Sequence, residues 1–198
     1  MVKKCGGLPL AISVLGGILK GKSSLRDWGM VNKDINSYLR MGKGIEEDHG
    51  AVTQVLGLSY NDLPYRLKSC FMHLGNFRED STIDAWKLYL LWMAEGLLSL
   101  DDQRQGETMT DVAERFLGEL AQRSMVQVEL VNKSFWSISG RFSSCRLHDL
   151  MLDLCLSKGK MEDFLKIFDS RSHGNDFAAF MTSSTSKTRR LAIHSGED

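Results

Sequence analysis

The sequence lacks an excess of charge of either sign. Its 25 Lys and Arg residues balance its 25 Asp and Glu residues, so the formal net charge is zero. A balanced chain has no overall field that would attract nucleic acid or an anionic membrane. The composition therefore disfavours functions that depend on a strongly basic or strongly acidic protein.

Cysteine is scarce, and long apolar runs are missing. The four cysteines, Cys5, Cys70, Cys145 and Cys155, stand in apolar helical or strand patterns and are too sparse for a secreted disulfide scaffold. We find neither a signal peptide nor an apolar run of about 18 residues. These features predict a soluble, cytoplasmic chain, and its 198 residues, 42% of them hydrophobic, can bury the core of one or two domains.

Only two prolines are present, and each stands where a helix can begin. Proline suits the first helical turn, and apolar residues recur with helical spacing after both Pro9 and Pro64. Ser24 with Asp27 makes a capping-box-like start for another helix. The segments with helical periodicity are 9–20, 24–39, 51–60 and 64–74. Short helices with short connections predict an antiparallel, four-helix-type bundle.

From about residue 65 the pattern changes to helices followed by strands. A predicted helix over residues 82–91 is followed by one that Thr110 or Asp111 would cap. The apolar period then switches to two, which is typical of strands. The expected strands are 126–130, 135–139 and 144–147, with a turn at 132–134.

The C-terminal part contains less regular patterns. Lys158 and Gly159 are expected to end a helix, and residues 164–168 form another apolar patch. Residues 170–187 are rich in Ser, Thr, Gly and Asn, which predicts a mobile loop. The chain contains no repeat with the period of leucine-rich repeats.

The stretch GGILKGKS at residues 16–23 matches the phosphate-loop expression G-x-x-x-x-G-K-[ST]. A phosphate loop follows a buried strand and opens a helix, whereas this stretch continues the helical periodicity that begins at Pro9. No apolar strand ending in a Mg²⁺-binding aspartate follows it. We therefore reject a phosphate loop here and expect this chain alone to bind little or no ATP or ADP.

Two C-x-x-H pairs, CFMH at 70–73 and CRLH at 145–148, raise the alternative of a metal site. The first pair lies in an amphipathic helix beside Phe71, a context typical of small buried residues. A catalytic Cys–His pair is disfavoured as well, because no oxyanion or substrate-positioning feature accompanies it. We expect no metal ligands and no catalytic residues.

The most informative segment is RLHDLMLDL at residues 146–154, where a short strand gives way to an amphipathic helix. A histidine at this transition can present a ring N–H to an anion, and Asp149 falls where a carboxylate can satisfy free backbone N–H groups. The simpler interpretation is a helix cap beside a partly buried histidine. The short motif does not decide between the two.

Four motifs in one order carry a more specific signal. They are GGLPLAI at 6–12, LSYNDLP with LKSCF at 58–71, LWMAEG at 91–96, and LHD at 147–149. Together they resemble the C-terminal half of the NB-ARC nucleotide-binding switch of plant intracellular immune receptors of the coiled-coil, leucine-rich-repeat type. The resemblance covers about residues 1–160 and implies a helical subdomain over 1–64 and a winged helix over 65–160. Residues 161–198 would then be a linker leading into leucine-rich repeats.

The resemblance also implies a function and its residues. Members of this family switch between ADP-bound and ATP-bound states in plant defence, and ADP lies between an upstream nucleotide-binding domain and the two subdomains found here. Pro9 and Leu10 would contact the nucleotide, with Pro9 against adenine or ribose, and His148 would donate a hydrogen bond to the β-phosphate. Asp149 would cap the helix that follows. The family's phosphate loop would lie upstream, so this chain is expected to be a fragment without ATPase activity.

The partners implied are the upstream domain and the downstream repeats of the same protein, and further copies of the activated receptor. The sequence departs from the family pattern at Leu147, where methionine is usual, and at residues 75–76 and 78–80, which puts the turn after the fourth helix in doubt. Leucine in place of methionine exchanges one apolar side chain for another of similar size, so the packing should be kept.

Two functions from other classes compete with this one. A DNA-binding winged-helix regulator needs a basic recognition helix and wing, but the helix 111–123 mixes acids with arginines and the wing offers only Lys133, Arg141 and Arg146. An interaction adaptor would use the helix that carries Trp86 and Trp92, although aromatic residues at helical spacing usually fill a core.

Overall fold

The computed structural model describes residues 2–41, 47–131, 141–169 and 190–194. Its α-helices are α1 (Pro9–Lys20), α2 (Leu25–Met41), α3 (Glu47–Asn61), α4 (Tyr65–His73), α5 (Ala85–Ala94), α6 (Met109–Gln122) and α7 (Asp149–Met161). Short 3₁₀ helices are Val2–Cys5, Leu74–Asn76 and Leu100–Asp102. The strands are β1 (Ile83–Asp84), β2 (Gln127–Leu130), β3 (Phe142–Arg146), β4 (Lys166–Asp169) and β5 (Leu191–His194).

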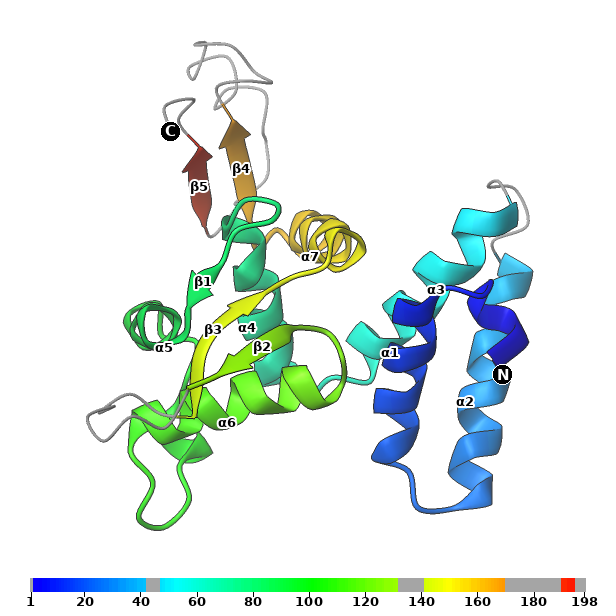
Figure 1. The fold of residues 1–198 in the computed structure, drawn as a ribbon, viewed down its shortest axis with the longest axis horizontal. Helices are drawn as coiled ribbons and strands as arrows, with labels where there is room; N and C mark the ends of the chain where they lie inside the picture. The colour runs from blue at the N-terminus through cyan, green and yellow to red at the C-terminus, as the bar shows by residue number, and fades with distance from the viewer. Residues whose placement is uncertain (1, 42–46, 132–140, 170–189, 195–198) are drawn as a thin grey trace.

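Helices α1, α2 and α3 form the first lobe, which we call the helical bundle; α3 packs against both of the other helices (Figure 1). Pro9 is the first residue of α1, and Ser24 Oγ accepts the backbone N–H of Asp27 at the start of α2 (3.1 Å). This lobe has its own buried apolar cluster, which consists of Cys5, Ala11, Leu15, Ile18, Val31, Ile35, Val55 and Leu58. The periodicity from Pro9 thus corresponds to one buried helix face.

The second lobe has the element order α4–β1–α5–α6–β2–β3, which we call the winged helix (Figure 1). Its antiparallel sheet has the strand order β1–β3–β2, with Ile83 and Val128 both opposite Cys145 of the central strand. The largest apolar cluster among the described residues, which we call the main core, lies between this sheet and the helices, and it includes Trp92, Leu117 and Leu120. The predicted fold class, a helical bundle followed by a winged helix with a small sheet, is confirmed.

The chain continues into α7 and a second, parallel sheet. Helix α7 packs against α3 and α4, and β4 pairs with β5, with Lys166 opposite Leu191. Phe164, Leu165 and Phe168 of the predicted apolar patch are buried. None of the described helices is long and apolar enough to span a lipid bilayer.

Several predicted boundaries are wrong for identifiable reasons. The helix expected from residue 82 begins at Ala85, because Ile83 and Asp84 pair with β3 and Asp84 then accepts the N–H of Lys87 (2.7 Å). The next helix begins at Met109, before either of the expected caps, Thr110 and Asp111. Its cap is Thr108, whose Oγ1 accepts the N–H of Asp111 while the Asp111 carboxylate accepts the N–H of Thr108.

Gly159 does not end α7. A Cβ at this position would lie 3.2 Å from Leu165 Cβ, so glycine permits the chain after the helix to fold back closely onto it. The helix ends at Met161, and Asp163 makes the turn with a φ of +49°. The expected turn at 132–134, the strand at 135–139 and the loop at 170–187 lie outside the described residues.

Candidate functional site

The strand-to-helix transition at His148 is held in place from both sides. Strand β3 pairs with β1 and β2, and Met151 and Cys155 bury α7 in the main core. Between them His148 has extended backbone angles (φ −78°, ψ 145°), and its Nδ1 accepts the backbone N–H of Leu150 at 3.3 Å. The accepting Nδ1 carries no proton, so the neutral ring carries its proton on Nε2. The half-buried ring therefore has one N–H donor that the cap does not use.

The capping role was predicted for the wrong residue. The N-cap of α7 is His148, and Asp149 is the first helical residue with an exposed side chain. A carboxylate at that position still favours the positive end of the helix dipole, but it does not supply the capping acceptor. The sequence pattern does not distinguish the two because His and Asp both carry acceptor atoms.

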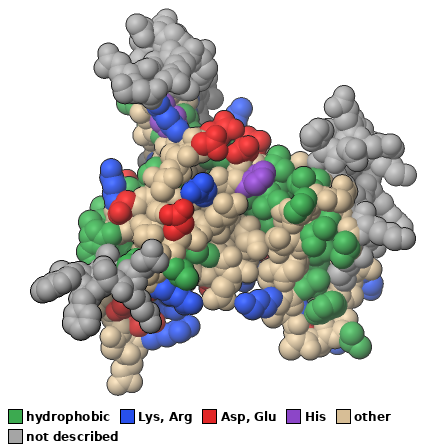
Figure 2. Space-filling model, in the orientation of Figure 1, with side chains coloured by type: hydrophobic (Ala, Val, Ile, Leu, Met, Phe, Trp, Pro, Cys, Tyr) green, Lys and Arg blue, Asp and Glu red, His purple; other side chains and the backbone are tan. Residues whose placement is uncertain are grey.

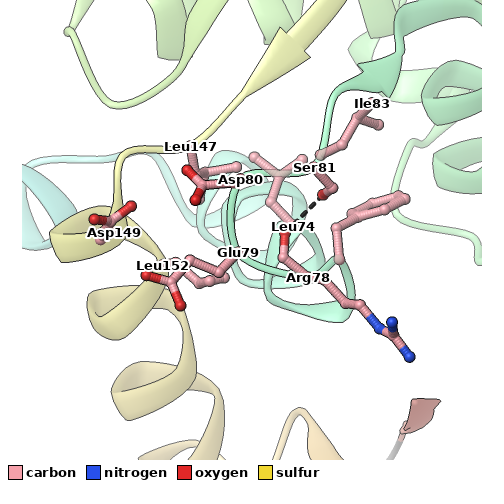
Figure 3. Close-up of a pocket in the computed structure, with 10 residues that line it drawn as sticks. Leu74, Arg78, Glu79, Asp80, Ser81, Ile83, Leu147, Asp149 and Leu152 are labelled. Atoms are coloured by element: carbon pink, nitrogen blue, oxygen red, sulfur yellow. Dashed lines mark hydrogen bonds between the residues drawn. The ribbon is translucent and has the colours of Figure 1, made fainter. Parts of the chain in front are cut away.

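A small space lies beside Asp149. Asp149 and Leu147 line a space of about 10 Å³ together with Glu79 and Asp80 of the turn before β1 (Figure 3). A space of this size holds about one water molecule. Arg78 also lines this space, so its lining carries both signs of charge. The space is too small for a phosphate, so it is not where His148 would contact an anion.

The turn at residues 78–80 is well defined although it lacks the usual proline. Asp80 adopts a left-handed conformation (φ +59°), and Ser81 Oγ donates to the carbonyl of Arg78 at 2.7 Å, as the dashed line in Figure 3 shows. Leu147 is half-buried against the main core, which agrees with an apolar exchange. Residues 78–80 depart from the family pattern, yet they form a tight turn next to the transition from β3 to α7.

Pro9 and Leu10 lie at the start of α1. The Pro9 side chain is exposed, and Leu10 is half-buried against the main core. Helix α3 packs against both α1 and α7, so the two predicted pairs of site residues lie on helices that share one neighbour (Figure 1). Their role in binding a nucleotide stays a prediction.

The first five residues of the rejected phosphate-loop match are helical, and the last three follow the end of α1. Gly16 and Gly17 lie within α1, which continues to Lys20. Lys22 Nζ donates to Asp62 at 2.7 Å, and Arg123 donates to the other Asp62 oxygen at 2.8 Å. Sequence analysis missed this ion-pair group, because its members are 40 and 61 residues apart and no local pattern links them.

The cysteines and His73 do not form a reactive or metal-binding group. Within the described part of the chain, no three His, Cys, Asp or Glu side chains are grouped to hold a metal ion. Burial raises the pKa of the Cys70 thiol and raises the pKa of Cys145 to about 12. Burial also lowers the pKa of His73 to about 4. Thiols in this state are protonated at neutral pH and are poor nucleophiles and ligands.

Several arginines of the winged helix are paired with acids of the same lobe or of the bundle, while Arg141 lies over the Phe142 ring and Lys133 of the predicted wing lies outside the described residues. On α6, Arg115 pairs with Glu107 (3.0 Å) and Arg123 pairs with Asp62, while Arg146 of β3 pairs with Glu129 (3.0 Å). Figure 2 shows Lys and Arg side chains scattered over the face rather than joined in one stripe. This arrangement disfavours DNA binding, which needs cations available for phosphates.

The two tryptophans have different environments. Trp92 is fully buried, whereas Trp86 is 41% exposed on the outer face of α5, one turn from the exposed Leu90. The prediction that such residues fill the core is thus confirmed for Trp92 and wrong for Trp86. The main core contacts α5 through its other face.

The comparisons with known proteins agree with the motifs. Residues 77–155 match the model of the disease resistance protein winged helix domain. Over 99% of its length the chain is 39% identical to probable disease resistance RPP8-like protein 2 of Arabidopsis thaliana, and over its full length it is 38% identical to disease resistance protein RPP8 of the same plant. It is also 38% identical, over 99% of its length, to disease susceptibility protein LOV1.

The chain spans about a fifth of the length of these relatives (21%, 20% and 20%). Strands β1, β2 and β3 and helices α5 and α6 of the winged helix fall within the matched residues, whereas α4 precedes them. The similarity to the relatives extends over α4 and the helical bundle as well. The family that the four motifs indicated is thereby confirmed. The chain is similar along its whole length to plant disease resistance proteins, and its residues 77–155 match their winged helix domain.

Proposed function

We propose that this chain is part of an ADP/ATP-dependent switch in a plant intracellular immune receptor, and that its winged helix senses the bound nucleotide. The observation that carries the proposal is the state of His148, whose Nδ1 caps α7 and whose Nε2 therefore carries the proton. A ring held in one tautomer at the start of a helix is suited to donate a hydrogen bond to a phosphate.

The nucleotide would connect the two lobes. The exposed Pro9 and the neighbouring Leu10 would contact the base or ribose from the helical bundle, and His148 would contact the β-phosphate from the start of α7. ADP would then bind the closed arrangement better than an open one, which is what a population switch requires. A hydrogen bond to a charged phosphate contributes about 1.5–3 kcal/mol, or roughly a 10- to 150-fold change in ADP affinity.

The rest of the switch would lie elsewhere in the receptor. The phosphate loop and the Mg²⁺ site would belong to an upstream nucleotide-binding domain, so hydrolysis is not a property of the segment described here. Strands β4 and β5 would lead into leucine-rich repeats, and the activated receptor would oligomerise in the cytoplasm. The size of the relatives, about five times the length matched, leaves room for these domains.

The test measures ADP release from a purified full-length receptor that carries this segment. His148→Asn keeps a side-chain acceptor suited to an N-cap, but it removes the imidazole N–H. We expect faster ADP dissociation and higher spontaneous activity for His148→Asn, in a protein that retains most of the wild-type stability.

An unchanged ADP off-rate in folded His148→Asn receptor would refute the phosphate contact. If His148→Ala lowered stability and activity together while the off-rate stayed constant, His148 would be a helix cap only. The two variants therefore separate the sensing role from the capping role.

A further inference from the structure

We infer that Gly17, Lys22, Asp62 and Arg123 form a lock that sets the angle between the helical bundle and the winged helix. The lock itself is a property of this chain, and its consequence for activation rests on the proposed function. Its members include residues of the rejected phosphate-loop match, for which it supplies a different role.

The first part of the lock is a close backbone approach between the lobes. A Cβ on Gly17 of α1 would lie 2.6 Å from Arg123 Cα and 2.7 Å from its carbonyl carbon and oxygen. Atoms of this kind do not approach so closely, and backbone cannot turn away as a flexible side chain can. Glycine at position 17 is therefore required for α1 to lie against the end of α6. The adjacent Gly16 would meet no atom within 4 Å and has no such constraint.

The second part is the ion-pair group on Asp62. Residues 62–64 connect α3 with α4, so Asp62 lies in the only stretch of chain that joins the two lobes directly in sequence. Lys22 reaches it from the bundle and Arg123 from the winged helix, and each side chain is less than a third exposed. Burial alone would raise the pKa of Asp62, but the two hydrogen-bonded cations outweigh it and hold that pKa below its usual value.

The two ion pairs of Asp62 would respond differently to a movement between the lobes. Rotation of the winged helix about residues 62–64 would separate Arg123 from Asp62 and from Gly17, because Arg123 moves with α6 (Figure 1). The same rotation would leave Lys22 on Asp62, since the backbone N–H of Asp62 is bonded to the Leu58 carbonyl of α3 (3.0 Å) and so keeps Asp62 with the bundle. Arg123 also pairs with Glu119 at the end of α6 (3.2 Å), so its charge would still have a partner after the ion pair with Asp62 breaks. Breaking that ion pair would therefore leave no isolated charge on Arg123, which makes the lock reversible.

Other contacts join the bundle to the rest of the molecule. Val14, Leu56 and Leu63 pack into the main core, and the Tyr60 ring packs against Phe71 of α4. Tyr60 also donates to Glu162, directly after α7 (2.6 Å). These contacts hold the lobes together, whereas the lock determines the angle on the side of α1 and α6. Without the lock, the lobes should remain attached but sample a range of angles.

The experiment measures the inter-lobe distance in the 198-residue chain by pulsed electron–electron double resonance. The labels are placed on Lys33→Cys in α2 and Lys87→Cys in α5; both positions are exposed. The four native cysteines are buried and should not react with the label. Each test variant has a matched control: Arg123→Gln with Arg115→Gln, whose ion pair stays within the winged helix, and Gly17→Ala with Gly16→Ala.

We expect a single narrow distance distribution for the wild type and for both controls, and a broadened or shifted distribution for Arg123→Gln and Gly17→Ala. The inference is overturned if Arg123→Gln, folded by circular dichroism, gives the wild-type distribution. If Gly17→Ala does not fold, the arginine pair decides the question alone.

The receptor provides the second measurement. In full-length protein, Arg123→Gln should increase ADP release and spontaneous activity relative to Arg115→Gln. Because the distance measurement uses the chain without nucleotide, it tests the lock independently. An open lock with unchanged ADP release would refute the coupling to nucleotide while leaving the lock in place.

Discussion

The helix cap at His148 can be tested in this chain without any nucleotide. His148→Ala removes the acceptor for the Leu150 N–H, which is one of the free donors at the start of α7. Loss of an N-cap destabilises proteins by about 0.5–2 kcal/mol. The hydrogen bond is rather long at 3.3 Å, and the ring is only half-buried, so we expect a loss of about 1 kcal/mol.

Two further substitutions make the prediction specific. Asparagine is among the best N-cap residues, so His148→Asn should retain most of the stability. Asp149→Asn removes an exposed negative charge. Its loss relieves repulsion from Glu79 and Asp80 but also removes a favourable interaction with the helix dipole, so the two effects on stability oppose each other. We therefore expect Asp149→Asn to change stability less than His148→Ala does.

Urea unfolding followed by circular dichroism measures these differences. A loss of about 1 kcal/mol should also lower the Tm by about 2–4 °C in a chain of this size. The reasoning is refuted if Asp149→Asn destabilises more than His148→Ala, or if His148→Asn is as unstable as His148→Ala. Either result would mean that the cap is not the contribution of this ring to folding.

Further predictions concern the rest of the chain. Thr108→Ala should lower the free energy of unfolding by about 1 kcal/mol, because Thr108 caps α6, whereas Thr110→Ala should have a smaller effect in the same urea titration. His73 takes up a proton below about pH 6.5 when unfolded, but only near pH 4 when folded, so stability should fall through this window as the pH decreases. The loss should reach about 3 kcal/mol at most and should largely disappear in His73→Leu; equal pH profiles would contradict it. Calorimetry should show feeble Mg-ATP binding by the chain alone, and micromolar binding abolished by Lys22→Ala would revive a phosphate loop. A gel shift at low salt should show negligible affinity for duplex DNA; a salt-sensitive micromolar complex would favour a DNA-binding regulator.

Local patterns predicted the helices with a strong apolar stripe and failed where pairing partners are distant. The stripe after Pro9 and the proline at position 64 both led to correct helix starts, because these signals lie within one or two turns. The two-residue strand Ile83–Asp84 was read as helix, because only its pairing with Ser144 and Cys145 makes it a strand. Thr108 was overlooked because Thr110 and Asp111 are equally good capping types, and the backbone conformation decides among them.

The candidate site was predicted in part. The sequence located His148 and Asp149 at a strand-to-helix transition, and the structure places them there. The sequence assigned the capping role to Asp149, whereas His148 caps the helix. The capping acceptor depends on which side chain turns back towards the Leu150 N–H, and this is a matter of three-dimensional geometry. Trp86 and Trp92 looked alike in sequence, yet one is exposed and the other is buried, because packing against β3 and α6 selects one face of α5.

By itself, the sequence determined the helical character of the chain, its motif order and its family, because these depend on residue types within a few positions of one another. Only the tertiary structure decided which residues meet at the boundary between the two lobes. Lys22, Asp62 and Arg123 meet across 40 and 61 positions, and Gly17 is indispensable only because the backbone of Arg123 passes beside it. Such contacts arise from the packing of whole helices, and a linear pattern carries no record of them.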